Sequence, residues 1–256
     1  MTFLRFIPTF VLIAGVAHAQ DWPSFRGPQG SGVAASARPP LTWNVESSAN
    51  IAWRTAIPGL GHSSPIVWGD RVYLTTAVSD APASQSLTLG DSDRAGIDAA
   101  KDLAPHRWQV MALDRASGTM IWTRTVHEGV PRVKRHVKAS HASATPTTNG
   151  HVVVAMLGSE GLFAFDSNGK ALWRKDLGAL SVGLADDPTY EWGPASSPVI
   201  HGDVVVVQND RYRDSFLIAF DLSTGKELWR SGRDELPAWT TPLVHTGGEF
   251  RIPKVK

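Results

Sequence analysis

Short apolar runs alternate with clusters of turn residues along most of the chain. The runs at residues 71–77, 151–157 and 203–208 are rich in β-branched side chains. Each run follows a dipeptide suited to a tight hairpin, namely Gly69-Asp70, Asn149-Gly150 and Gly202-Asp203. Such runs, bounded by Gly, Asn and Asp, predict β-strands joined by hairpins.

A longer pattern recurs three times: an apolar strand with Asp, a polar turn with Gly, then Trp. The Gly and Trp are four residues apart in each copy: Gly118 and Trp122, Gly169 and Trp173, Gly225 and Trp229. The acidic residues of the three turns are Asp114, Asp166 and Asp221. Gly supplies the positive φ of such turns, Asp can accept turn amides, and Trp buries a large apolar face against a neighbouring unit.

A second landmark is a Ser-Pro or Thr-Pro pair that precedes each of these patterns. The pairs are Ser64-Pro65, Thr145-Pro146 and Ser197-Pro198, and a turn Gly follows four residues after each Pro. Each unit therefore has four strands, which we denote A (with Pro), B, C (with Asp) and D (with Trp). Four antiparallel strands at a repeat of about 50 residues predict an all-β chain of β-propeller blades.

The boundaries of the units leave pieces at both ends. We expect an N-terminal arm at 20–49, a closing D strand at 50–57 that contains Trp53, and blades at 62–126, 140–177 and 194–231. Residues 239–256 begin with the pattern of a fourth A strand and then lack a β-branched run. The expected architecture is an incomplete ring of about three to four blades.

These repeats resemble those of the PQQ-like (pyrroloquinoline-quinone-like) β-propeller proteins secreted by bacteria. Two further stretches are similar to segments of that family: Trp-Pro-Ser-Phe-Arg-Gly-Pro at 22–28 and Arg-His-Val-Lys-Ala-Ser-His-Ala at 135–142. The resemblance implies the fold of quinoprotein dehydrogenases, with rings of seven or eight blades. On that comparison the chain is expected to be an N-terminal fragment of such a ring.

The start of the chain has the features of a secretory signal peptide at residues 1–19. Arg5 precedes a mostly apolar run at 6–16, and Ala17-His18-Ala19 supplies a small-x-small cleavage site before Gln20. A membrane anchor is the alternative, but a spanning helix needs about 20 apolar residues. Cysteine is absent, which excludes disulfides, thiolate metal sites and a lipoprotein anchor. We expect a periplasmic or extracellular protein that is not a lipoprotein.

Charge and motifs exclude several function classes. Lys plus Arg total 25 and Asp plus Glu total 24, so the net charge of +1 gives no general attraction to nucleic acid or anionic membranes. Metalloprotease, nucleophile-elbow and phosphate-loop motifs are absent. His136 and His141 lie five residues apart in a loop, which is weak evidence for a metal site. We therefore predict no catalytic residues and no metal ligands.

Candidate ligand contacts gather on one face, because B–C and D–A connections share one end of an antiparallel blade and are the longer ones here. The connections include 78–107, 125–140 and 177–193, and long loops on a rigid scaffold commonly carry function. The candidates are His62, Arg132, Arg135, His136, Lys138, His141, Trp192, Arg211, Arg233 and Trp239. Arg forks and aromatic rings suit an anionic or stacking ligand. The alternative is a solvated loop surface whose tryptophans pack between blades.

The sequence favours an exported, non-catalytic binding or scaffold module for a protein, peptide or glycan, with no cofactor. The family resemblance implies one alternative, an oxidoreductase that uses PQQ with calcium. Many such enzymes also carry a vicinal disulfide, which the lack of Cys excludes here. A further alternative is a ligand-free structural fragment that self-associates through unfinished propeller edges.

Overall fold

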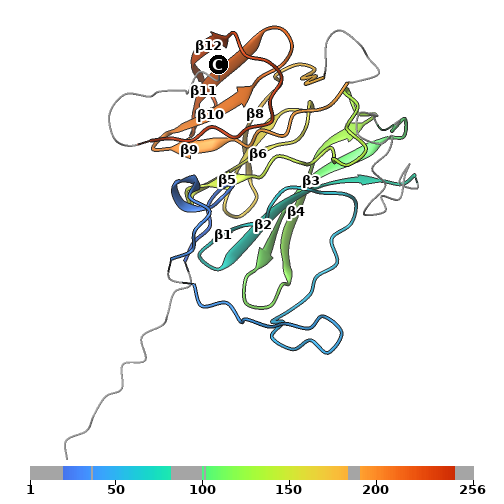
Figure 1. Ribbon diagram of the computed structural model, residues 1–256, viewed down its shortest axis with the longest axis vertical. Helices are drawn as coiled ribbons and strands as arrows, with labels where there is room; N and C mark the ends of the chain where they lie inside the picture. Colours follow the sequence, from blue (N-terminus) through green and yellow to red (C-terminus); the bar gives the residue numbers. More distant parts are fainter. Residues whose placement is uncertain (1–19, 36, 82–99, 101, 184–190, 246–256) are drawn as a thin grey trace, which may run out of the picture.

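A computed structural model describes residues 20–245 except 36, 82–99, 101 and 184–190 (Figure 1). The signal peptide predicted at 1–19, the centre of the long insertion and the end of the chain lie outside these residues. A single 3-10 turn, η1 (Pro28–Gly30), precedes the strands in the described part. No helix found among the described residues is long and apolar enough to cross a membrane.

Three four-stranded antiparallel sheets follow one another along the chain. The first blade contains β1 (Ile66–Trp68), β2 (Arg71–Ser79), β3 (His106–Asp114) and β4 (Met120–Gly129). The second contains β5 (Thr147–Thr148), β6 (Val152–Met156), β7 (Leu162–Asp166) and β8 (Ala171–Lys175). The third contains β9 (Val199–His201), β10 (Val204–Asn209), β11 (Ser215–Asp221) and β12 (Glu227–Arg233). Neighbours in each sheet are consecutive in sequence, as the A-to-D order predicts.

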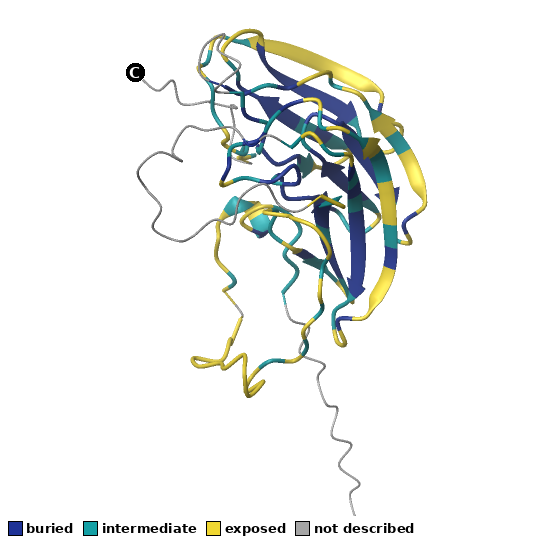
Figure 2. Ribbon diagram, turned by 90° about the vertical axis from the view of Figure 1, so that its right-hand side faces the viewer, coloured by how far each residue is buried: buried dark blue, intermediate teal, exposed yellow. Residues whose placement is uncertain are grey.

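The blades are arranged side by side, with their first strands on a common inner side. β5 of the second blade lies beside β1 of the first and β9 of the third. The last strands, above all β12, are the most exposed, whereas the middle strands are buried (Figure 2). This arrangement confirms the all-β propeller fold predicted from the repeats.

The core consists of side chains packed between neighbouring blades. On β7, Phe163 and Phe165 point into the cluster shared with the first blade, whereas Leu162 and Ala164 point into the cluster shared with the third. Successive residues of a strand face opposite sides of the sheet. Because the second blade is covered on both faces, the middle strand is apolar at consecutive positions rather than at every second one.

Each repeat Trp docks on the Asp–Gly turn of the following blade. The indole Nε1 of Trp122 donates a hydrogen bond to the carbonyl oxygen of Ser167 at 3.0 Å, and the ring lies against Gly169. Trp173 repeats the contact with the carbonyl of Leu222 at 2.8 Å. The Trp residues of the repeat therefore hold consecutive blades together.

The turn Asp residues act inside their own hairpins, as predicted. A carboxylate oxygen of Asp114 accepts the backbone N–H of Ser117 at 2.7 Å. Hydrogen bonds from Thr224 and Ser223, with the Thr224 hydroxyl contributing most, lower the pKa of Asp221 to about 2. These bonds stabilise the turns on which the tryptophans dock.

The prediction of a closing strand at 50–57 is wrong as to strand structure but its Trp takes the expected position. No described strand lies beside this segment to pair with it, so it runs irregularly. The Nε1 of Trp53 nevertheless donates to the carbonyl of Arg115 at 2.8 Å, and its ring covers Gly118 of the first blade. At the other end, Trp229 on β12 is 46% exposed.

Hydroxyl groups of the Ser/Thr-Pro pairs link the inner strands in series. The N–H of Ser64 donates to Oγ1 of Thr145 at 3.0 Å, and the N–H of Thr145 donates to Oγ of Ser197 at 2.9 Å. The N–H of Ser197 donates in turn to Oγ1 of Thr241 at 3.1 Å. The fourth A strand predicted at 239–244 does not form, because no described strand pairs with it. Thr241 still occupies the position of the fourth hydroxyl.

The N-terminal arm runs along the inner strands of the first two blades. Trp22 exchanges two backbone hydrogen bonds with Val67 of β1, at 2.7 and 2.9 Å. The N–H of Thr148 on β5 donates to the carbonyl of Pro23 at 2.9 Å. The segment that resembles family members at 22–28 therefore bridges two blades.

The inter-blade contact can be tested by comparing G169A with G202A. Both glycines have positive φ, +79° and +56°, but a Cβ on Gly169 would lie 2.7 Å from the Trp122 ring, whereas one on Gly202 meets nothing within 4 Å. We expect G202A to cost about 1–2 kcal/mol of unfolding free energy through backbone strain alone. G169A should cost a further ~1–3 kcal/mol through overpacking. Urea unfolding measures both, and equal losses would contradict the docking contact.

Candidate functional site

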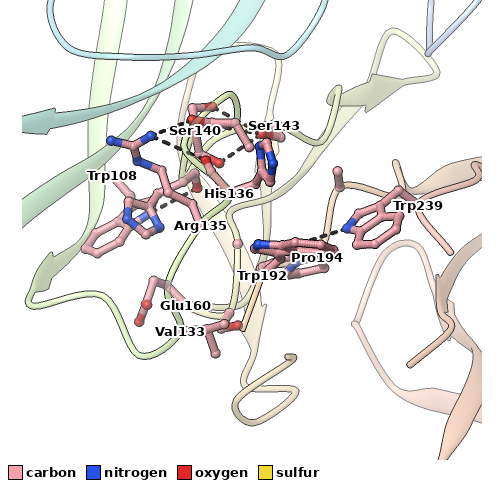
Figure 3. A pocket seen from close by; sticks show the side chains of 16 residues that line it. Trp108, Val133, Arg135, His136, Ser140, Ser143, Glu160, Trp192, Pro194 and Trp239 are labelled. Carbon is pink, nitrogen blue, oxygen red and sulfur yellow. Dashed lines mark hydrogen bonds between the residues drawn. The ribbon is translucent and has the colours of Figure 1, made fainter. Parts of the chain in front are cut away.

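A pocket of about 340 Å³ lies among the long connections (Figure 3). Every lining residue except Trp108 of β3 lies in a connection, either a D–A loop, the β6–β7 turn or the segment after β12. The lining residues are Trp108, Val133, Arg135, His136, Ala139, Ser140, His141, Ser143, Gly158, Ser159, Glu160, Trp192, Gly193, Pro194, Ala195 and Trp239. Three inter-blade connections and one turn thus meet at a single site.

Aromatic rings form one wall of the pocket. The rings of Trp192 and Trp239 have centroids 5.7 Å apart and planes inclined by 50°, and His136 meets Trp192 edge-on at 5.3 Å. Trp239 is fixed by a hydrogen bond from Nε1 to the carbonyl of Gly193 at 3.2 Å. Trp192 is only 9% exposed, and its Nε1 has no hydrogen-bond partner. The wall therefore offers apolar faces and one unsatisfied donor.

Arg135 lines the pocket but its charge is balanced inside the protein. Its Nε donates to Oδ2 of Asp102 at 2.6 Å, and its Nη1 donates to the backbone carbonyls of Val137 and Ala139 at 3.3 and 2.9 Å. Both charged side chains of the pair are about 9% exposed. A buried, paired guanidinium of this kind mainly orders the loop at 135–139.

Two histidines complete a cluster around Asp102. The Nε2 of His141 lies 3.1 Å from Oδ2 of Asp102, and hydrogen bonds from His141 and then Arg135 lower the pKa of that carboxyl well below its usual range. The Nδ1 of His106 lies 2.9 Å from the carbonyl of Ala104, and burial lowers the pKa of His106.

The ligand atoms of Asp102, His106 and His141 lie within 4.8 Å of one another, which is a spacing that a metal ion could bridge. The Arg135 guanidinium already bonds the only carboxylate of this group, so a divalent cation there would face a buried positive charge. The arrangement therefore favours a structural ion-pair network over a cation site.

Glu160 is a buried acid in the β6–β7 turn. Its Oε1 accepts the backbone N–H of Arg132 at 3.0 Å. Its Oε2 lies 3.2 Å from Nε2 of His127 and 3.3 Å from Nε of Arg132, close enough for ion pairing but without the alignment of a hydrogen bond. Oε2 is thus a buried acceptor at the pocket without a hydrogen-bond donor.

The structure brings together half of the residues proposed from the sequence. Five line the pocket: Arg135, His136, His141, Trp192 and Trp239. Arg132 stands behind it through Glu160 and also pairs with Asp176 at 2.7 Å. His62 lies beside the cluster, where burial and then the Arg135 charge lower its pKa.

The other three predicted contacts do not line the pocket. Lys138 is exposed, and its backbone N–H donates to Nδ1 of His136 at 3.0 Å. Arg233 forms a buried pair with Asp210 at 2.7 Å, and Arg211 donates to the carbonyl of Asp214 at 3.2 Å. These side chains order the third blade and its connections.

Sequence reasoning missed Trp108, Asp102 and Glu160. Trp108 is indistinguishable from a core residue because it lies in an apolar strand. Asp102 follows a polar insertion with no periodicity. Glu160 sits in a Gly-Ser-Glu-Gly turn, where a flanking Gly pair signals a reversal but not that the acid is buried.

The repeats and the site can now be compared with known proteins. A family model described as "Outer membrane protein assembly factor BamB", of the PQQ repeat type, matches residues 106–248, more than half of the 256 residues. The chain belongs to this PQQ-like β-propeller repeat family. Among curated protein sequences, none matches the chain.

Three solved structures illustrate the range of PQQ-like propellers that the chain resembles. A europium-containing methanol dehydrogenase is 16% identical, with a TM-score of 0.43 over 67% of this chain and 25% of that one. The quinohemoprotein alcohol dehydrogenase of Comamonas testosteroni is 16% identical, with a TM-score of 0.43 over 86% and 28%. BamB from Moraxella catarrhalis is 19% identical, with a TM-score of 0.36 over 74% and 57%. The chain thus spans about a quarter of each dehydrogenase and just over half of that BamB.

The buried histidines of the site predict a loss of stability at mildly acidic pH. Burial favours the neutral form of His106, so the unfolded chain binds more protons below the unfolded pKa of about 6.5. Stability is therefore present above that pH and falls as the pH drops below it. The lowered pKa of Asp102 has the same sign at still lower pH, below about 4.

Unfolding in urea at pH 7.5 and 5.5 tests this prediction. His106→Asn retains a side-chain N–H near the Ala104 carbonyl but cannot titrate, so its loss of stability between the two pH values should be smaller. His201→Asn, at an exposed position on β9, is the matched control and should behave like the parent chain. An unchanged pH dependence in the His106 variant would contradict the assignment.

Proposed function

We propose that the chain is a non-catalytic binding module of an exported protein, and that its long-loop face holds a protein, peptide or glycan. The observation that supports this most directly is the pocket walled by Trp108, Trp192 and Trp239 on that face. Ligand sites are typically concave and largely apolar, with a few convergent polar groups. Tryptophan is also the residue type most enriched at binding hot spots.

The pocket lacks the groups that chemistry on a ligand would need. Glu160 is the one carboxylate among its described lining residues, and it is engaged by Arg132 and His127. Glycoside hydrolysis, for comparison, uses two carboxyl groups that flank the bond. A binding role needs no such pair.

The quinone alternative can be weighed on the same residues. Calcium takes six to eight oxygen ligands, mostly from carboxylates, carbonyls and amides. No Asp, Asn or Gln is among the pocket residues that the structure describes. The pocket therefore does not fit a quinone held with calcium, and we derive no oxidoreductase step from it.

Export and partner class follow from different features. The signal-like start at 1–19 supports a periplasmic or extracellular location, and the family description names an outer membrane assembly factor. Both are consistent with a partner presented outside the cytoplasm. The exposed Leu228 and Trp229 on β12 supply a second surface, on which two copies could associate.

A peptide array and a glycan array, each probed with the chain and with W239A, test the binding role. Trp239 is 39% exposed, so its replacement should leave the fold intact while removing one wall of the pocket. We expect spots bound by the parent chain to lose most of their signal with W239A. W229A, which removes an exposed Trp outside the pocket, should retain it. Array signals that are equal for all three proteins would contradict a role for this pocket.

Incubation with PQQ and calcium tests the oxidoreductase alternative. The binding-module hypothesis predicts no new absorbance band and no dye reduction with alcohols or sugars. Either signal, if lost in W239A, would overturn the non-catalytic assignment.

A further inference from the structure

The ligand class of the pocket can be narrowed from its unsatisfied polar atoms and its charge balance. We infer that the pocket recognises a neutral saccharide, of one or two sugar rings at a time. This inference rests on the proposed function, because it assumes that the pocket is a binding site. It goes further by excluding charged and purely apolar ligands.

The charge balance argues against an ionic ligand. Arg135 is paired with Asp102 at 2.6 Å, and Glu160 is paired with Arg132 at 3.3 Å. Both ionised side chains that line the pocket in the described part of the chain therefore have a partner of opposite charge. A phosphate, carboxylate or ammonium ligand would have to displace an internal partner, which costs several kcal/mol for a buried pair.

The unsatisfied atoms argue against a purely apolar ligand. Nε1 of Trp192 is a buried donor without an acceptor, and Oε2 of Glu160 is a buried acceptor without a hydrogen-bond donor. Both residues line the pocket. An aliphatic or aromatic ligand would seal these atoms from water without satisfying them. A hydroxyl group both donates and accepts, so a ligand with several hydroxyls can satisfy both atoms.

The aromatic wall supplies the other half of the recognition. Figure 3 shows Trp192 and Pro194 between the His136 side of the pocket and Trp239. The two indoles, inclined by 50°, present a corner of apolar surface. A sugar ring has C–H faces for such a corner and hydroxyls around its edge. A volume of about 340 Å³ is near the lower limit of ligand pockets and fits a compact group.

An extended peptide also carries donors and acceptors, but the site offers it little. Peptides that bind by strand addition need a free sheet edge. Only Trp108 among the lining residues belongs to a strand, and β3 is paired on both sides, by β2 and β4. The observations therefore favour a sugar over a peptide strand.

Isothermal titration of the full chain with defined probes tests the inference. The neutral probes are maltotriose, cellotriose, xylotriose and chitotriose. Trigalacturonate is the acidic counterpart, and decaproline is the peptide probe. We expect at least one neutral trisaccharide to bind, and trigalacturonate to bind about tenfold more weakly or not at all, because its carboxylates meet no unpaired cation.

Variants of the two tryptophans test the contacts. W239A should weaken binding of the neutral trisaccharide about tenfold or more, since it removes an aromatic wall. W192F keeps a ring but removes the Nε1–H donor, and it should weaken binding about 3- to 10-fold. W229A is the control and should bind like the parent chain. Thermal unfolding of each variant separates a lost contact from a lost fold, and W239F replaces W239A if the latter unfolds.

The outcomes distinguish this inference from the proposed function. Pocket-dependent binding of decaproline or trigalacturonate, with no neutral saccharide bound, would overturn the saccharide class and leave the binding module in place. Saccharide binding that is the same in W239A and W192F would overturn the assignment to this pocket. No binding by any probe, together with arrays that do not respond to W239A, would overturn both.

Discussion

The contact of one blade's Trp with the next blade's turn is the interaction on which the rest of the structure depends. A single four-stranded sheet of this size cannot bury both of its faces. Docking of Trp122 and Trp173 sets adjacent blades face to face, which buries the clusters around Phe163 and Ile218. The contact requires Gly at the turn, because any Cβ there would overlap the indole ring. The most constrained part of the repeat is therefore a small residue and a large one in different blades.

The inner end of each blade is held by a second, weaker device. Hydroxyls of the Ser/Thr-Pro pairs accept backbone N–H groups of the preceding blade, from Ser64 through Thr145 to Ser197. Together the two devices fix each blade at its inner strand and near its outer edge. The loops between blades then project from a rigid base, and residues as distant in sequence as Trp108 and Trp239 come to line one pocket.

The charges of the long-loop face serve the structure more than a ligand. The basic residues at 132–138 suggest an anionic partner when only the sequence is considered. In the folded chain, Arg132 and Arg135 are neutralised by Glu160, Asp176 and Asp102. Two of these acids are largely buried, where an ion pair is screened little by solvent. What remains at the pocket is an aromatic wall and two unsatisfied polar atoms, which is why a neutral ligand suits it better.

The sequence by itself determined the fold class, the four-strand unit and the face on which a site would form. These follow from local rules: strand periodicity, Gly at positive φ, Asp in turns, and the fixed Gly-to-Trp spacing. It also identified Trp192, Trp239, Arg135, His136 and His141 as candidate contacts. Local rules were insufficient for segments 50–57 and 239–244, because strand formation there depends on a neighbouring strand. Only the tertiary structure decided that Glu160 is buried, that Asp102 neutralises Arg135 and that Arg211 and Arg233 lie away from the pocket. Partners of a charge are chosen by contacts between residues far apart in sequence, and no local pattern encodes them.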